Sequence, residues 1–284
     1  MAEHTIVYVH GISDHDDGYS DAWFESLRSH LSRPLLKQEV LWSNLVNAAM
    51  TYGDAGPEAD AAAAEEQRLR EELEQELNRR KARNGQVRAL ASSGPPNAPA
   101  MYGGSGLAMD DFVRYMAWES TREAILARFD EVVRPLLADG HTLHIIAHSW
   151  GTVVSYEGLR RLDDQSYTGR VANLFTLGGA LSIGTVQRNL FGRVNDGRLP
   201  AHVVQIVNID AGGDVVGGTI SPPFAGVEQH LDLVPTGCST WRIRRLFGKP
   251  IARNPACAHS SYFQADNLRV NRDILAHHIN RSLT

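Results

Sequence analysis

The sequence predicts a protein of the α/β class, in which a mostly parallel central sheet is covered by helices on both faces. Two observations lead to this prediction: short apolar runs recur along the chain, and segments with helical spacing of apolar residues separate them. Short apolar runs are typical of strands buried on both faces, and strands that alternate with helices form parallel sheets. The chain has 284 residues, of which 43% are hydrophobic, so it can bury a full core in a single domain.

Five apolar runs are the expected strands. They lie at residues 5–9, 39–42, 143–147, 171–177 and 203–209. Apolar residues spaced by three and four positions predict amphipathic helices at residues 21–31 and 152–162. We expect right-handed crossovers between the strands, because parallel strands joined through a helix almost always connect in this way.

The alternation of strands and helices is interrupted between residues 43 and 140, where a single crossover helix would suffice. We therefore expect a largely helical and Gly/Pro-rich insertion at about residues 50–110. Within it, residues 60–83 predict a helix that is mostly solvated and lies on the domain surface or against a partner. Its narrow apolar stripe consists of Leu69, Leu73 and Leu77, and its favourable i,i+4 charge pairs are Glu66 with Arg70 and Glu76 with Arg80.

The segment at residues 143–154 carries the main chemical signal, because an apolar strand, a serine between small residues and a helix follow one another there. This order predicts a nucleophile elbow, a turn so tight that larger side chains at Ala147 or Gly151 would clash with a neighbouring strand or helix. The turn lifts a serine oxygen above the sheet and places the following amides at a helix N-terminus, where they can stabilise an oxyanion. Ser149 is therefore the candidate nucleophile.

A second signal lies at the end of the first expected strand, where His10 and Gly11 follow the apolar run. An acyl-transfer site needs two backbone N–H donors for the oxyanion, one after the nucleophile and one from a loop at an adjacent strand end. Trp150 and Ile12 are the candidates for this oxyanion hole. His148 is expected to line the pocket or to pack beneath it, because its backbone is fixed beside the nucleophile.

With these motifs the chain resembles the α/β-hydrolase superfamily, and in particular its serine esterase and lipase branch. The resemblance rests on Val9-His10-Gly11, on the elbow at residues 147–151 and on two later segments, and it covers the chain except for about residues 50–110. It implies an α/β-hydrolase fold and a catalytic triad in the chain order nucleophile, acid, histidine. The sequence departs from the family pattern at Ala147, where the first elbow position is usually Gly; alanine is still small.

The acid of the triad should follow the strand at residues 203–209, where Asp210 and Asp214 flank a pair of glycines. Asp214 resembles the family's acid, and Asp210 is expected to make structural hydrogen bonds at the strand end; the choice between them stays open. The histidine resembles the family's at His259, after the sheet and before the C-terminal helix. His230 is expected to precede a late strand.

No metal site is predicted, although the chain has 12 histidines. Residues 14–17 group three acids with a histidine, but adjacent residues rarely point to one centre, so a solvated loop is expected. His141, His144 and His148 lie along one strand, and only two of them share a face. The other histidines considered, His277 and His278, fall on a helical pattern that indicates a solvated or packing role.

Composition excludes some classes of function. The net charge of −5 gives no positive field for a nucleic acid, and the longest apolar runs are too short for a transmembrane segment. No secretory signal is visible, so we expect a cytoplasmic protein. Cys238 and Cys257 are expected to be two thiols rather than a bridge.

The sequence thus predicts an esterase or lipase-like enzyme that needs no cofactor and acts on a small-molecule acyl ester or a lipid. A thioester, an amide or acyl transfer to an alcohol stays open, because one fold serves them all. The insertion is expected either to cap Ser149 or to dock a protein partner through residues 60–83. The alternative function is a non-catalytic binding protein with the same fold that uses this helix.

Overall fold

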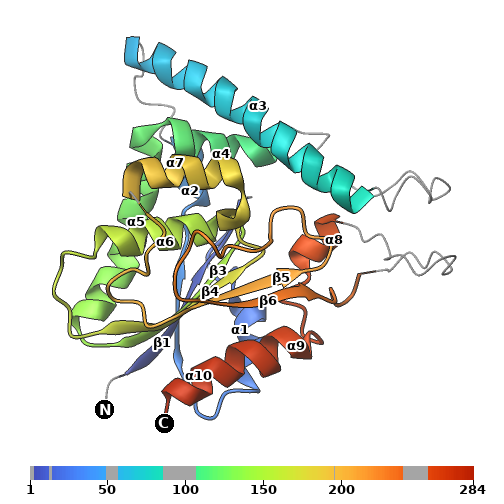
Figure 1. Cartoon of the computed structure of the whole chain (residues 1–284). Coiled ribbons are helices and arrows are strands. Elements are labelled where there is room, and N and C mark those ends of the chain that lie inside the picture. Colours follow the sequence, from blue (N-terminus) through green and yellow to red (C-terminus); the bar gives the residue numbers. More distant parts are fainter. Residues whose placement is uncertain (1–2, 13–14, 49–56, 86–106, 195, 239–254) are drawn as a thin grey trace, which may run out of the picture.

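The computed structural model describes residues 3–12, 15–48, 57–85, 107–194, 196–238 and 255–284. Its centre is a six-stranded sheet in which every pair of neighbours is parallel, in the order β2-β1-β3-β4-β5-β6. The strands are β1 (His4–Val9), β2 (Leu36–Val40), β3 (Thr142–His148), β4 (Arg170–Leu177), β5 (Ile206–Ala211) and β6 (Val227–Leu233). The predicted α/β class is confirmed, with helices on both faces of the sheet (Figure 1).

The central strands lie where the apolar runs predicted them, and the two edge strands differ. The edge strand β2 begins before the predicted residues 39–42, and β6 contains His230, which was wrongly expected to precede it. Both edge strands are largely polar, with side chains that are mostly exposed or half-buried. A strand with one open edge and a solvated face does not need an apolar run, so the pattern that reveals buried strands misses it.

The helices cover the two faces unequally. One face carries α1 (Asp21–Arg28) and the C-terminal segment formed by α9 (Leu268–Val270), the π-helical turn η3 (Asn271–Ala276) and α10 (His277–Ser282). The other face carries α2 (Ser43–Ala48), α3 (Pro57–Gly85), α4 (Leu107–Ala117), α5 (Glu119–Ala138), α6 (Gly151–Arg161), the short 3-10 turn η2 (Ala180–Ser182) and α7 (Gly184–Val194). The short helix α8 (Pro255–Ser260) stands between β6 and α9 in the chain.

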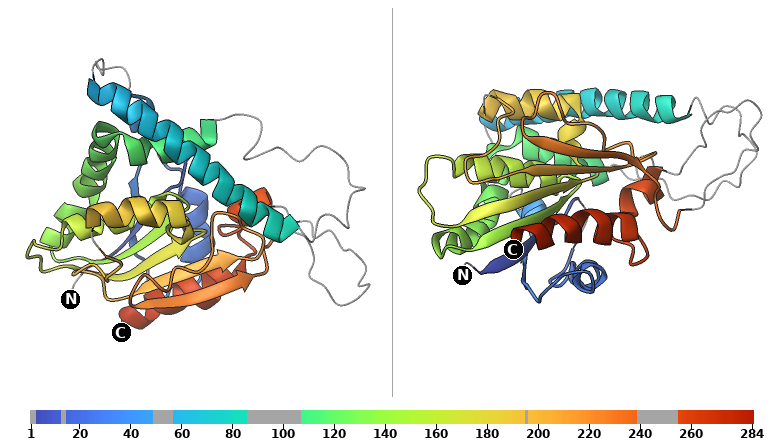
Figure 2. Two further views of the ribbon diagram at one scale, coloured as in Figure 1. Left: turned by 45° about the horizontal axis from the view of Figure 1, so that its top comes forward. Right: turned by 60° about the horizontal axis from the view of Figure 1, so that its bottom comes forward.

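Helix α3 belongs to the folded body of the protein. It lies outermost on its face and contacts α4 and α7 (Figure 2). The predicted stripe of Leu69, Leu73 and Leu77 is fully buried in the main hydrophobic core. Both predicted charge pairs form, at 2.9 Å for Arg70 with Glu66 and 3.3 Å for Arg80 with Glu76. The surface position of this helix is confirmed, and its narrow stripe is covered by the chain itself.

A buried carboxylate ties the helices of this face together. Glu157 of α6 is 2% exposed and accepts hydrogen bonds from Tyr115 of α4 at 2.9 Å and from Arg122 of α5 at 2.7 Å. Arg193 of α7 donates to the same carboxylate at 2.7 and 3.0 Å. Because a buried charge needs such partners, this network fixes α6 relative to three other helices.

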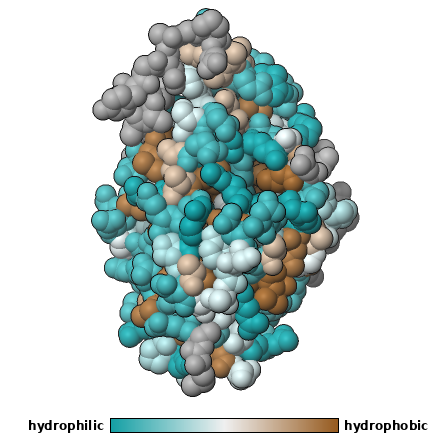
Figure 3. Space-filling model, turned by 90° about the vertical axis from the view of Figure 1, so that its left-hand side faces the viewer, coloured by the Kyte–Doolittle hydropathy of each residue, from teal (hydrophilic) through white to brown (hydrophobic). Residues whose placement is uncertain are grey.

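The surface is mixed in character. On the face shown in Figure 3, apolar side chains form separate groups among hydrophilic ones. Among the described helices, none combines the length and the apolar composition needed to cross a bilayer.

Candidate active site

Ser149 occupies a sharp turn between β3 and α6. Its φ is 53°, in the left-handed region that residues other than glycine rarely adopt. The surrounding backbone holds this conformation: the Ser149 N–H donates to the carbonyl of Leu177 at 3.0 Å, and the Ser149 carbonyl accepts from Thr152 Oγ1 at 2.7 Å and from the Ala180 N–H at 3.2 Å. A strained residue that is fixed from several sides is typical of a functional site.

Two glycines allow this turn to pack against the end of β1. A Cβ atom on Gly151 would lie 2.3 Å from the carbonyl oxygen of His10 and 2.5 Å from that of Val9. A Cβ atom on Gly11 would lie 2.6 Å from Cβ and 3.2 Å from Oγ of Ser149. The loop after β1 therefore lies directly against the serine side chain, and only glycine fits at either position.

His10 holds this loop in place. Its Nδ1 donates to the carbonyl of Gly11 at 2.6 Å, and its Nε2 accepts from the Trp42 N–H at 3.0 Å. Burial, followed by the nearby His15, lowers the pKa of His10 to about 3, so the imidazole is neutral. One donating and one accepting nitrogen are what a neutral imidazole offers, and His10 is a positioning residue for the loop that carries Gly11.

Asp214 and His259 form a buried hydrogen-bonded pair. Nδ1 of His259 lies 2.9 Å from Oδ2 of Asp214, and the two side chains are 5% and 0% exposed. Tyr262 also donates to Oδ2 at 2.7 Å, and the N–H groups of Val216 and Gly217 donate to Oδ1 at 2.8 and 3.2 Å. Burial alone would raise the pKa of Asp214, but the charge of His259 and these hydrogen bonds lower it to about 2. The carboxylate is therefore ionised and orients the imidazole.

The serine is not hydrogen-bonded to this pair. Ser149 is 1% exposed, and its Oγ has no hydrogen-bond partner among the residues that the structure describes. His148 connects the two parts, because its Nε2 donates to the carbonyl of His259 at 2.9 Å and the two rings lie 4.6 Å apart. Catalytic hydrogen bonds are often long or absent before a substrate binds. His148, which was expected to line the pocket or to pack beneath it, thus lies against the ring of His259.

Asp210 differs from Asp214 in its surroundings. It is buried at the end of β5, and its Oδ1 lacks a hydrogen-bond partner in the described part of the chain. Burial, then the charges of Asp214 and Asp232, raise the pKa of Asp210 to about 8. The carboxyl group of Asp210 does accept a hydrogen bond from the backbone of Asp232, as expected of a structural residue at the strand end, although Oδ1 itself takes part in none. The Nδ1–H group of His259 donates to Asp214 and not to Asp210.

Trp150 lies beneath the insertion. Its side chain is fully buried, and its ring packs 4.4 Å from that of Phe112 and 5.4 Å from that of Tyr115, both in α4. Ile12 is half-buried against the same core. Helix α4, which begins at the end of the expected insertion and continues beyond it, therefore packs on the residue that follows Ser149.

Arg80 of α3 reaches the loop of the candidate acid, a contact that the sequence did not predict. Its guanidinium donates to the carbonyl of Gly217 at 3.0 Å, and to Oγ and the carbonyl of Ser182 at 2.9 and 2.6 Å. One turn earlier, Glu76 accepts from the Gly184 N–H at 2.8 Å. In the sequence these two residues resembled an ordinary solvated charge pair, so no local signal distinguishes the contact.

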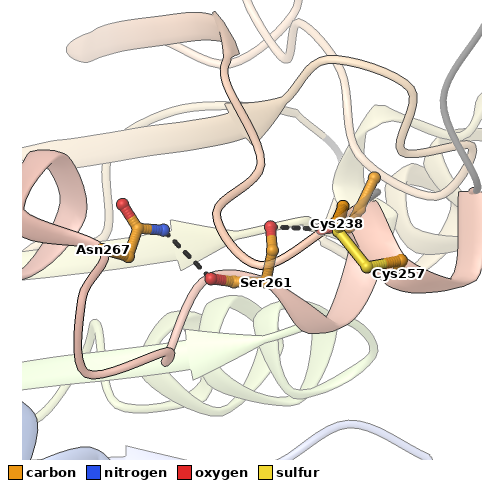
Figure 4. The surroundings of a disulfide bond; sticks show 5 residues. Cys238, Cys257, Ser261 and Asn267 are labelled. Carbon is orange, nitrogen blue, oxygen red and sulfur yellow. Dashed lines mark hydrogen bonds between the residues drawn. A yellow bond between two sulfur atoms is a disulfide. The ribbon is translucent and has the colours of Figure 1, made fainter. Parts of the chain in front are cut away.

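The two cysteines form a disulfide, and the prediction of two thiols is wrong. Cys238 lies after β6 and Cys257 in α8, with 5.7 Å between their Cα atoms (Figure 4). Two cysteines 19 residues apart carry no signature of pairing, and only the fold brings them together. One end of the bridge, Cys257, lies two residues before His259 in the chain. On the other side of that histidine, Asn267 donates to the carbonyl of Ser261 at 3.0 Å.

The histidines weighed as metal ligands have other contacts. His144 lies 2.8 Å from Nδ2 of Asn173, and His141 lies 2.9 Å from Oγ1 of Thr5. Residue 14 of the acidic run is outside the described residues. A group that the sequence did not indicate does meet the spacing of a metal site, and it consists of Glu228, His230 and His278.

A comparison of the chain with protein families, with curated proteins and with solved structures gives no match.

Proposed function

We propose that this protein is a serine hydrolase of the α/β-hydrolase type, which cleaves a carboxylic ester through an acyl-enzyme. One observation carries the proposal: Ser149 is held at a φ of 53° between β3 and α6, and His148 connects it to the buried pair of His259 and Asp214. A non-catalytic binding protein would use the fold only as a scaffold and would not need a strained serine near an ionised acid–histidine pair.

The mechanism follows from the hydrogen bonds. Because the Nδ1–H group of His259 donates a hydrogen bond to Asp214, the proton of the neutral imidazole stays on Nδ1 and the other ring nitrogen, Nε2, carries a lone pair. Nε2 takes the proton of the Ser149 hydroxyl while Oγ attacks the ester carbonyl carbon. The proton then passes to the leaving alkoxide, an acyl-enzyme forms, and a water molecule activated by the same histidine releases the acid. No cofactor takes part in these steps.

The oxyanion of the tetrahedral intermediate is assigned to two backbone N–H groups, those of Ile12 and Trp150. Gly11 supports this assignment, because its close approach to Ser149 carries the loop before Ile12 to the reacting oxygen. Each donor would contribute about 3 kcal/mol to stabilisation of the transition state.

The insertion at about residues 50–110 is proposed to cap the site together with α4, which continues beyond it. The supporting contacts are those of Phe112 and Tyr115 with Trp150, together with the burial of Ser149. Substrates are proposed to be small-molecule acyl esters, including lipids. A partner that docked on α3 would have to use its charged outer face, since Leu69, Leu73 and Leu77 are already buried.

A fluorophosphonate probe tests the proposal, because it reacts only with an activated serine. We expect stoichiometric labelling of Ser149 in the native protein and no labelling of Ser149→Ala or His259→Ala. Ser149→Ala should also lower kcat toward nitrophenyl esters by at least about 10⁴-fold while the circular dichroism spectrum is unchanged. A native protein that resists the probe and hydrolyses no member of an acetyl-to-palmitoyl ester series would favour the binding protein instead. Parallel assays with thioesters and amides define the acyl bond.

A further inference from the structure

Glu228, His230 and His278 come together on the face of the sheet opposite α3. Glu228 and His230 are two residues apart in β6 and therefore project from the same face of the strand. His278, in α10, packs onto that face and is 5% exposed. One ligand atom of each residue lies within 4.8 Å of the others. None of these residues takes part in the proposed hydrolysis.

The separations fit a shared divalent cation. Oε1 of Glu228 lies 3.0 Å from Nε2 of His230 and 3.3 Å from Nε2 of His278. Ligand atoms about 2.0–2.1 Å from a tetrahedral zinc ion are about 3.3 Å from one another, so two edges of the tetrahedron already have the required length. The third edge is at most 4.8 Å, which a rotation of the half-buried His230 side chain would shorten.

Simple ion pairing does not account for the arrangement. Although Nε2 of His230 is 3.0 Å from the Glu228 carboxylate, it is buried and makes no hydrogen bond to any described residue. The two groups are thus close without being aimed at each other. A buried ring nitrogen without a partner is costly, and a cation between the side chains would supply one.

His278 is oriented from behind by a polar network. Its Nδ1 lies 3.0 Å from the side-chain amide of Gln205, which in turn contacts Oδ1 of Asn173 at 2.5 Å. Metal-bound histidines usually donate the proton of their other ring nitrogen to such a group, which fixes the ring and the tautomer. In the structure one amide nitrogen of Gln205 makes both contacts, so ligation through Nε2 requires an end-over-end rotation of this amide, which brings its oxygen to Nδ1 and gives up the hydrogen bond to Asn173.

We propose that Glu228, His230 and His278 bind a divalent transition-metal ion, with Zn²⁺ as the best fit. Two imidazoles and one carboxylate are ligands that zinc accepts in four-coordinate sites, and a water molecule would complete the shell. The ion would join the edge strand β6 to the C-terminal helix α10. Because this site shares no residue with the esterase site, the proposal is independent of the proposed function.

Metal binding by the full-length protein tests this proposal. Zn²⁺ is titrated against a chromophoric chelator after complete removal of bound metal, and Co²⁺ replaces it for absorption spectroscopy. We expect one ion per chain with a Kd in the micromolar range or below, and a visible spectrum typical of tetrahedral Co²⁺. Zn²⁺ should raise the Tm of the protein, because it binds only the folded state.

Matched variants locate the site. His230→Gln and Glu228→Gln change partly exposed side chains and should fold; each should weaken Zn²⁺ binding by at least about tenfold and remove the rise in Tm. His277→Gln is the control, because His277 is the exposed neighbour of His278. Unchanged affinity in both site variants, loss of binding in His277→Gln, or no saturable binding by the unmodified protein would each overturn the proposal. Labelling of Ser149 by the fluorophosphonate probe is expected in all of these proteins.

Discussion

Arg80 and Gly217 join helix α3 to the loop that follows Asp214: the Arg80 guanidinium donates to the Gly217 carbonyl at 3.0 Å, and the Gly217 N–H donates to Asp214 at 3.2 Å. The same guanidinium approaches the carbonyls of Val215 and Val216, at 3.4 Å each. A single side chain of α3 thus donates to three successive carbonyls of the turn that follows Asp214. The insertion thereby helps to position the carboxylate without touching it.

Arg80→Ala should lower kcat toward short nitrophenyl esters by about ten- to a hundredfold, because small displacements of a catalytic group have effects of this size. KM for an acetyl ester should change little, since the contacts of Arg80 are with Glu76, Ser182 and the loop after Asp214, and none is with Ser149. Arg79→Ala is the control, because Arg79 is the exposed neighbour of Arg80 on α3. Equal rates in the two variants would show that the contact is merely structural.

Asp214→Asn should lower kcat by about 10⁴-fold, because it removes the charge that fixes the His259 tautomer. Asp210→Asn should have a much smaller effect on kcat, since a pKa of about 8 leaves Asp210 largely protonated at neutral pH. Steady-state kinetics of both variants at pH 7 provide the measurement. If Asp210→Asn were the more damaging change, the acid would have to be reassigned to the strand end.

Asp210 should also make the protein less stable as the pH rises. Its pKa is about 8 in the folded state, against about 3.9 in an unfolded chain, so the folded state binds the extra proton between about pH 4 and pH 8. The free energy of unfolding therefore falls with pH in this window, by up to about 1.4 kcal/mol per unit from this group. The free energy of unfolding of Asp210→Asn, measured by urea titration and taken relative to that of the unmodified protein, should therefore be higher at about pH 8 than at about pH 5. An equal difference at both values would contradict this.

Loss of the disulfide should impair catalysis more than folding. Cys238→Ser combined with Cys257→Ser frees α8, which carries His259, while the sheet and both cores are untouched. We expect the double variant to have a lower kcat and an unchanged circular dichroism spectrum. In the unmodified protein, no thiol should react with a thiol reagent after denaturation. Reactive thiols in freshly purified protein would contradict the bridge. Disulfides are typical of oxidising compartments, so this assay also bears on the cytoplasmic location, which stays a prediction.

Gly11→Ala should abolish most of the activity, because the added methyl group would lie 2.6 Å from Cβ of Ser149, whose backbone cannot move aside. A fall in kcat of at least about a hundredfold is expected. Gly192→Ala serves as the control: apart from the adjoining backbone of α7, no atom lies within 4 Å of the added carbon, so activity should be unchanged and stability equal or slightly higher. Comparable activity of the two variants would argue against the close approach of the Gly11 loop.

The sequence alone determined the parallel sheet, its central strands and the sharp turn at Ser149. These features depend on interactions between residues that are close in the chain: an apolar run buries itself on both faces, and a strand that turns at once into a helix needs small residues at Ala147 and Gly151. The turn packs against Val9 and His10 as the small residues require. Local patterns could therefore predict these elements.

The tertiary structure decided what depends on residues far apart in the chain. The hydrogen bond of Asp214 to His259 spans 45 residues, and the one between Arg80 and Gly217 spans 137. The sequence left Asp210 and Asp214 open because both follow the same strand. It gave no sign of the disulfide, because the separation of two cysteines does not reveal whether the fold brings their Cα atoms to 5.7 Å. Burial raises the pKa of both aspartates, and the contacts of Asp214 with His259, Tyr262 and Val216, which Asp210 lacks, separate the two values; these contacts exist in the folded chain only.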